Sequence, residues 1–223
     1  MIVYHGSDHI IEVPVYNGGK HTNDYGTGFY TTESIDLAME WACSDNRDGF
    51  ANCYEAELDN LSILNLNSSE YNILNWLAVL TKYRTYWQNG SIAEEAKVYL
   101  QQHFFVDPSP YDVIIGYRAD DSYFAFAQDF VSGTIPLSKL AEAMHLGQLG
   151  EQIVFKSRKA FSHIRFIGAE SAKASTWFAK KTAREQQARR AYREANKSVS
   201  IVNELFMIDI MREGIKNGDP RLR

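Results

Sequence analysis

The sequence predicts an α+β fold for residues 1–170, followed by a helical carboxy-terminal extension over residues 171–223. Short strand-like runs and helical patterns follow one another without the regular alternation of a parallel α/β protein. Residues 112–116 form a continuous apolar run, which is typical of a buried strand. The 223 residues suffice for one substantial core with an appendage.

The elements predicted in the first half are three strands and the helices between them. Alternating or apolar runs predict the strands at residues 2–5, 29–32 and 52–58. A helix follows the second strand, because Leu37, Ala38 and Trp41 share one face at helical spacing. Most of residues 70–104 is predicted to be helical, with a break at residues 89–90.

The second half continues with three further predicted strands, at residues 112–116, 151–155 and 164–167. A helix is predicted before the second of them, with Thr134 as its N-cap, Pro136 in its first turn, and Gly147 and Gly150 at its end. The extension is predicted as a long basic helix over residues 172–197 and an amphipathic helix over residues 201–215, with Leu205, Ile208 and Met211 on one face.

Charge and composition narrow the class of protein. The net charge is −5, but residues 171–198 hold eight basic and only two acidic side chains, so an acidic body is joined to one basic segment. Two cysteines, Cys43 and Cys53, are too few for a disulfide scaffold and fit a reducing cytosol. No signal-peptide pattern and no apolar run near the roughly 20 residues of a membrane span is present. We expect a cytoplasmic protein without a membrane span.

The common phosphate-binding and metal-binding motifs are absent from the sequence. There is no Walker loop, no G-x-G-x-x-G after a strand and no metal-ligand spacing among the six histidines. Asp120 and Asp121 are adjacent, and we prefer a loop role at the rim of a cleft for them because no further ligands are evident. The sequence therefore predicts no metal.

Two short motifs near the amino terminus point to a ligand site. Tyr4-His5-Gly6-Ser7 is followed by Asp24-Tyr25-Gly26-Thr27-Gly28-Phe29-Tyr30. Each is a strand-like run that carries one polar ring, with glycines that permit close approach of a ligand to the backbone. A histidine and a tyrosine so placed can hold a dinucleotide and stack on its reactive ring. Asp24 and Tyr25 either shape a turn or join the site, and both interpretations stay open.

With a third motif, Gly150-Glu-Gln-Ile-Val-Phe155, these residues resemble in order and spacing the histidine–tyrosine–glutamate branch of ADP-ribosyltransferases. Over residues 1–170 the chain is most similar to a bacterial group, DUF3990, which residues 112–116 and 118–124 also resemble. The resemblance implies a split β-sheet core with surrounding helices. It also implies NAD as co-substrate, without a metal.

The resemblance assigns a role to each motif residue. His5 would bind a ribose hydroxyl of the adenosine half, the Gly6 backbone would hold the nicotinamide carboxamide, and Tyr30 would stack on the nicotinamide ring. Glu151 would bind the 2′-hydroxyl of the nicotinamide ribose and stabilise the cationic sugar, whose oxocarbenium character resembles that of glycoside hydrolysis. Ser7, Tyr25 and Gly28 complete the set expected near NAD.

The catalytic position itself has two candidates, Glu151 and Gln152. Adjacent residues of a strand point to opposite faces, so only one of them can face the site. Glu151 is preferred, facing inward with Ile153 and Phe155. With Gln152 in its place, an amide could bind a ribose hydroxyl but could not act as a base.

The preferred function is a mono-ADP-ribosyltransferase that modifies a nucleic acid or a protein. As implied by the resemblance, it would be a prokaryotic toxin of a toxin–antitoxin or anti-phage system, and NAD hydrolysis without transfer is a variant. The basic helix is a solvated face or a surface for RNA or DNA phosphates. The alternative is a catalytically silent module that binds a nucleotide or a partner through its carboxy-terminal helices, for example an antitoxin or a second copy.

Overall fold

The computed structural model describes residues 1–85, 90–119, 121–145, 150–196 and 204–222. Its strands are β1 (Ile2–Ser7), β2 (Phe29–Thr31), β3 (Gly49–Ala56), β4 (Ile63–Asn65), β5 (Val113–Tyr117), β6 (Glu151–Phe155) and β7 (Ile164–Ala172). Its helices are α1 (Ile35–Ala42), α2 (Ile73–Tyr83), α3 (Ser91–His103), α4 (Asp121–Val131), α5 (Leu137–His145), α6 (Arg158–Phe161), α7 (Ala174–Asn196) and α8 (Met207–Arg212), with a 3₁₀ turn, η1, at Pro220–Leu222. The predicted α+β class is confirmed.

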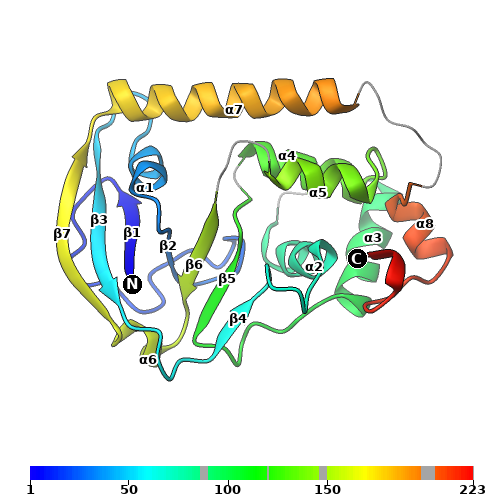
Figure 1. Cartoon of the computed structure of the whole chain (residues 1–223), viewed down its shortest axis with the longest axis horizontal. Helices are drawn as coiled ribbons and strands as arrows, with labels where there is room; N and C mark the ends of the chain where they lie inside the picture. The colour runs from blue at the N-terminus through cyan, green and yellow to red at the C-terminus, as the bar shows by residue number, and fades with distance from the viewer. Residues whose placement is uncertain (86–89, 120, 146–149, 197–203, 223) are drawn as a thin grey trace.

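The strands form two sheets that lie side by side (Figure 1). One is antiparallel with the order β1-β3-β7, and the other has the order β2-β6-β5-β4, with β4 parallel to β5. The sheets meet where Tyr4 of β1 and Thr32 after β2 exchange two backbone hydrogen bonds of 2.8 and 3.0 Å. This seam brings the middle of β1 next to the end of β2, and with them His5 and Tyr30.

Helices cover the sheets on different sides. The largest core joins the four-stranded sheet to α2, α3, α4, α5 and α8 through fully buried residues such as Trp76, Leu77, Leu100 and Phe130. Helix α1 packs on β1 and β3, and α7 runs across α1, α4 and α5 (Figure 1). Among the described residues, no helix combines the length and the apolar character of a transmembrane span.

The carboxy-terminal extension shares the core of the body. Tyr192 of α7 stacks on Phe126 of α4 at 4.0 Å between ring centroids and donates a 2.8 Å hydrogen bond to Asp129. Arg184 of α7 donates two hydrogen bonds, of 2.9 and 2.7 Å, to the buried Glu40 of α1. Strand β7 also runs to Ala172, past the predicted boundary at residue 170. The division into two domains stays a prediction about folding units.

Three sequence-based expectations for helices were wrong. Residues 121–131 form α4 and not a rim loop, because Tyr123, Phe126, Ala127 and Phe130 make a buried helical stripe. Thr134 does not cap α5, which begins at Leu137, and its hydroxyl instead lies 3.0 Å from that of Ser132. Helix α8 buries Met207 and Ile210, whereas Ile208 of the predicted face is 46% exposed.

Other boundaries differ by small amounts. The structure adds β4 and α6, which are too short to give a clear periodic pattern. It extends β1 and β7 beyond the predicted runs, and β3 both begins and ends before its predicted run of residues 52–58. Gly150 directly precedes β6 and has a φ of 63°, a left-handed conformation that favours glycine. The predicted break at residue 89, Gly147, and the start of the last helix at residue 201 lie outside the described residues.

Candidate functional site

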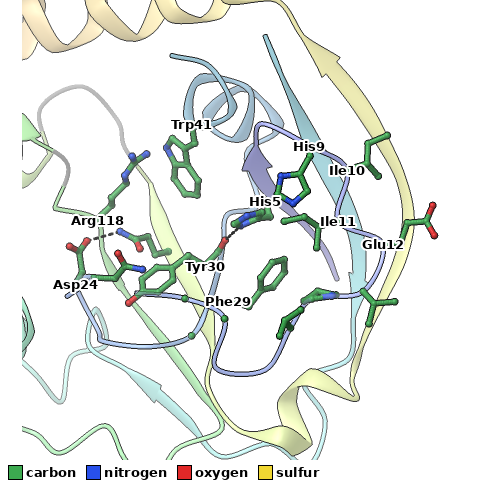
Figure 2. Close-up of a pocket in the computed structure, with 18 of the residues that line it drawn as sticks. His5, His9, Ile10, Ile11, Glu12, Asp24, Phe29, Tyr30, Trp41 and Arg118 are labelled. Carbon is green, nitrogen blue, oxygen red and sulfur yellow. Dashed lines mark hydrogen bonds between the residues drawn. The ribbon is translucent and has the colours of Figure 1, made fainter. Parts of the chain in front are cut away.

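A cavity of about 820 Å³ opens beside the seam between the two sheets (Figure 2). This volume lies within the roughly 300–1,000 Å³ of typical ligand sites. We call one side the strand wall, formed by His5, Asp24, Phe29, Tyr30 and Gln152. The facing side is the loop wall, formed by the segment after β1, residues 9–15 with Gly18 and Gly19. Trp41, Arg84 and Arg118 also line the cavity.

His5 is held by the backbone of β2. Its Nδ1 lies 2.7 Å from the carbonyl oxygen of Tyr30, and since a carbonyl can only accept, Nδ1 carries the proton of this bond (Figure 2). Burial lowers the pKa of the imidazole below its ordinary 6.5, and the bond to Tyr30 opposes this only in part. A neutral ring with its proton on Nδ1 leaves Nε2 as a hydrogen-bond acceptor.

Tyr30 presents its ring to the cavity while its hydroxyl is bonded on both sides. The hydroxyl donates to the carbonyl of Gly26 at 2.6 Å and accepts from the backbone N–H of Tyr25 at 3.0 Å. Burial, followed by the charge of Asp24, raises the pKa of this hydroxyl well above 10. The phenol is therefore neutral and its ring plane is fixed, which suits stacking and not proton transfer.

Asp24 and Gln152 form the polar end of the strand wall. The Asp24 carboxylate is 3% exposed and accepts from Arg84 Nε at 2.7 Å and from the Ala119 backbone N–H at 2.8 Å. It also accepts from Gln152 Nε2 at 3.0 Å. A loop carboxylate, an arginine after α2 and an amide on β6 are thus joined at one edge of the cavity.

With this geometry established, the comparisons place the chain in a family. A family model described as a protein of unknown function, DUF3990, matches residues 1–166. The chain belongs to the DUF3990 family. Neither the curated proteins nor the solved structures contain a match to it. The DUF3990 segment includes every residue of both cavity walls and ends inside β7, so α7 and α8 lie beyond it.

The expectation that Glu151 faces the cavity is wrong. Glu151 is exposed, its Oε1 accepts a 2.9 Å hydrogen bond from Asn67, and it does not line the cavity. Ile153 and Phe155 do face the same side as Glu151, but that side packs into a second apolar core. Gln152 points the other way and is 4% exposed. The DUF3990 segment of this chain therefore has an amide at the cavity.

Gly6 and Ser7 have structural roles in the fold. A Cβ on Gly6 would lie 2.1 Å from the carbonyl oxygen of Ala38, so the glycine is required by the packing of α1 on β1. The glycine was expected to permit close approach of a ligand. Its position is instead explained by this packing contact with α1. The Ser7 hydroxyl donates to the carbonyl of His9 and accepts from Asn52 Nδ2 at 3.1 Å. Neither residue lines the cavity.

Of the other two expected residues, only Gly28 lines the cavity. A Cβ on Gly28 would lie 2.6 Å from Val154 Cγ1, so only glycine lets this segment cross β6 closely. Tyr25 is fully buried and donates a 2.6 Å hydrogen bond to the carbonyl of Tyr117, which answers the open question in favour of a structural role. Lys156 supports the same segment by donating to the Tyr25 carbonyl at 2.6 Å, and burial lowers its pKa to about 8.

Asn52 supports the loop wall from behind, and the sequence analysis missed it. It lies on β3, is fully buried, and accepts from the Ile11 backbone N–H at 2.8 Å. Its Nδ2 donates to the carbonyls of His5 at 3.2 Å and His9 at 3.3 Å. Asn52 thus ties the start of the loop wall to β1. An amide on the buried face of an alternating strand, in register with Tyr54 and Ala56, was the signal available.

The sequence analysis also did not identify three further residues as part of the cavity lining, namely Trp41, Arg84 and Arg118. The Arg118 guanidinium lies 4.2 Å from the centroid of the Trp41 ring, and that of Arg84 lies 5.2 Å from the Phe124 ring. Both arginines follow an element that ends at the cavity, α2 or β5. No described group of three or more His, Cys, Asp or Glu side chains could hold a metal ion, and Asp120 lies outside the described residues.

Proposed function

We propose that this chain binds NAD in the cavity and transfers its ADP-ribose part to a macromolecular acceptor. The observation that carries the proposal is the pairing of His5 with Tyr30. One backbone bond makes His5 Nε2 an acceptor, and two hydroxyl bonds fix the Tyr30 ring beside it. An acceptor for a sugar hydroxyl and a platform for a flat ring are what a dinucleotide requires.

The proposed roles follow from these contacts. His5 Nε2 accepts a hydrogen bond from a ribose hydroxyl of the adenosine half, and the Tyr30 ring stacks on nicotinamide. Gln152 binds the 2′-hydroxyl of the nicotinamide ribose. These groups hold the reacting sugar in one orientation, and such positioning is a large part of what an enzyme contributes.

The proposed reaction breaks the bond between C1′ of the ribose and the nicotinamide nitrogen. The electron pair of that bond stays on nicotinamide, which leaves as a neutral molecule, and an oxygen or nitrogen of the acceptor bonds to C1′. The acceptor loses one proton to solvent, since the Gln152 amide cannot take it. NAD and the acceptor thus give the ADP-ribosylated acceptor, nicotinamide and a proton.

The amide of Gln152 also favours a second candidate, a catalytically silent module. A carboxylate beside C1′ would stabilise the cationic sugar, and losing one such group typically costs about 10²–10³ in rate. A chain with an amide at this place can bind NAD or ADP-ribose and act through its carboxy-terminal helices instead. The two candidates share the ligand and differ in whether nicotinamide is released.

Labelled NAD separates the two candidates. Purified protein is incubated with NAD labelled in the adenylate part, and nicotinamide release and label transfer to cellular RNA, DNA and protein are measured. Release with transfer supports the transferase, and release alone indicates NAD hydrolysis. Binding of NAD by calorimetry without release identifies the silent module, and absence of both binding and release contradicts the proposal.

Matched histidine variants supply the control for this assay. His5→Ala removes the Nε2 acceptor and should lower NAD binding and nicotinamide release together. His163→Ala changes a half-buried histidine that does not line the cavity, so both quantities should stay at the wild-type level. Equal behaviour of the two variants would speak against a ligand role for His5.

We further propose that the transferase acts as a toxin on RNA, DNA or protein in the cytoplasm and is restrained by an antitoxin protein. Lys180, Arg190 and Arg193 on the exposed side of α7 would favour a nucleic acid as the acceptor. Expression of the wild-type chain should then slow growth, and His5→Ala should relieve this where His163→Ala does not. Unimpaired growth at a high level of wild-type protein would contradict the toxin role.

A further inference from the structure

The Asp24 carboxylate receives more hydrogen bonds than a loop residue needs for a turn. Its Oδ1 accepts from Arg84 Nε, and its Oδ2 accepts from both the Ala119 backbone N–H and Gln152 Nε2. Three donors from three parts of the chain therefore fix both oxygens. The carboxylate is 3% exposed, so it is removed from exchange with bulk water.

This arrangement determines which end of the Gln152 amide faces the cavity. A carboxylate oxygen accepts and does not donate, so the Gln152 atom 3.0 Å from Asp24 Oδ2 must be the nitrogen. The carbonyl oxygen Oε1 is then the free end. No donor among the described residues reaches Oε1. Oε1 is also absent from the set of fully buried side-chain atoms that lack a hydrogen-bond partner, so it keeps some exposure to solvent. Oε1 is therefore accessible as an acceptor in the cavity wall.

Arg84 and Ala119 hold the Asp24 carboxylate in one orientation. Because they bind the Asp24 carboxylate from other directions, its rotation would break their hydrogen bonds as well as that of Gln152. Arg84 also donates to the Ala119 carbonyl, which closes the network into a ring. The amide is thus oriented before any ligand arrives, and such preorganisation avoids an ordering cost on binding.

We propose that Asp24 is a positioning residue, which holds the carbonyl of Gln152 toward the cavity so that the site selects a sugar with a free hydroxyl at that point. This inference rests on the proposed NAD site and adds the group that orients it. His5 Nε2 is a second acceptor in the same wall. Two acceptors in one wall match a ligand with hydroxyls on both sides, as in the two riboses of a dinucleotide.

The test compares ADP-ribose with an analogue that lacks the 2′-hydroxyl of the terminal ribose. Neither ligand contains nicotinamide, so the comparison measures binding without the reaction. Binding of both to the full chain is measured by calorimetry. Wild type should bind ADP-ribose about tenfold more tightly than the deoxy analogue, as one hydrogen bond to a preoriented acceptor provides. Gln152→Met keeps the length of the side chain and should bind the two equally.

Asp24→Asn is the decisive variant. An asparagine offers one neutral oxygen, so its NH₂ group must face either Arg84 Nε or the pair of Ala119 N–H and Gln152 Nε2, and the hydrogen bond that orients the Gln152 amide is weakened or lost. The preference for the hydroxyl should fall from about tenfold toward one. A purely structural role predicts a different result, in which both ligands weaken by the same factor and the preference stays. That result would overturn the proposal.

Two controls keep the outcomes distinct. Glu151→Met alters the exposed neighbour of Gln152 and should leave the preference unchanged. If Asp24→Asn does not fold, the Nε2 protons of Gln152 are followed by NMR in wild type, with Gln152→Met for assignment. They should stay protected when ADP-ribose binds, and their release from Asp24 would refute the proposal. If the wild-type chain binds neither ligand, the proposed NAD site itself is contradicted.

Discussion

The strand wall and the loop wall of the cavity are held in different ways. In the strand wall, the side chains of Asp24, Tyr30 and Gln152 are tied to the chain by hydrogen bonds of 2.6–3.0 Å. In the loop wall, Val13 is 80% and Val15 is 73% exposed, and apolar side chains predominate. The first wall is set before a ligand arrives, whereas the second offers a surface for contacts that need no fixed polar geometry.

The loop wall is nevertheless anchored at two points. Asn52 and Tyr54 bind the backbone of Ile11, the asparagine at its N–H and the tyrosine hydroxyl at its carbonyl. Further along, the Tyr16 ring packs edge-on against Phe161 at 5.5 Å between centroids. Between these anchors lie the exposed valines. The comparison therefore predicts strong effects for changes in the strand wall and at the anchors, and weak effects for changes between them.

The largest effect is expected for the two neighbours on β6. Gln152→Ala removes the acceptor at the cavity and should lower nicotinamide release by about 10²-fold, in the range of a lost preorganised group. Glu151→Ala should stay within about threefold, because its partner is Asn67 on the other side of the strand. Initial rates with labelled NAD, and circular dichroism to verify folding, measure both. A larger loss for Glu151→Ala would assign the catalytic role to the exposed carboxylate and reverse the comparison.

This pair also shows where sequence reasoning reaches its limit. Alternation correctly predicted that Glu151 and Gln152 face opposite sides, and that Ile153 and Phe155 share the side of Glu151. It could not say which side meets the cavity, because both faces of this sheet are covered. The two apolar residues suggested an inward side, and that side is indeed a core, but the cavity lies on the other.

Most helices and strands could be predicted from local sequence patterns. Most of what the sequence did not predict depends on contacts between residues far apart in the chain. The strands at the three motifs were predictable from alternation, and α7 from its composition. Asp24 could not be recognised as an organising residue, because its partners Arg84, Ala119 and Gln152 lie 60, 95 and 128 residues away. Helix α4 was a different failure, since its apolar spacing was present in the sequence and was overlooked.

The next largest effect is expected for Asn52, the anchor of the loop wall. Asn52→Ala leaves the Ile11 N–H and the carbonyls of His5 and His9 without a buried partner, which should lower the free energy of unfolding by about 1–3 kcal/mol. Urea unfolding measures the change. Asn217→Ala is the control, since this asparagine is exposed and should change stability by less than about 0.5 kcal/mol. Equal stability of the two variants would show that the loop wall needs no anchor.

The lowered pKa of His5 should make both the stability of the chain and its ligand affinity depend on pH. Burial lowers the pKa of His5 in the folded chain below 6.5, so the unfolded chain binds more protons between the two pKa values. The contribution of His5 to stability is therefore present above pH about 6.5 and is lost as pH falls through the folded pKa. Affinity for ADP-ribose should fall over the same range, because the protonated ring has no acceptor at Nε2.

Calorimetry at a series of pH values tests this dependence, with His5→Gln as the variant that does not titrate. Wild-type affinity should be constant above pH about 6.5 and should decrease on further acidification, by up to tenfold per pH unit below the folded pKa. The affinity of His5→Gln should be lower and flatter across the series. An affinity that rises on acidification would mean that the imidazolium binds an anionic group of the ligand.

The smallest effect is expected for the exposed part of the loop wall. Val13→Ser removes apolar surface at a position that is already 80% exposed, so its affinity for ADP-ribose should stay within about threefold of wild type. If this wall serves the acceptor, label transfer to cellular macromolecules should fall more than nicotinamide release. A loss of ADP-ribose affinity as large as that of His5→Gln would place the ligand against the loop wall and remove the distinction between the two sides of the cavity.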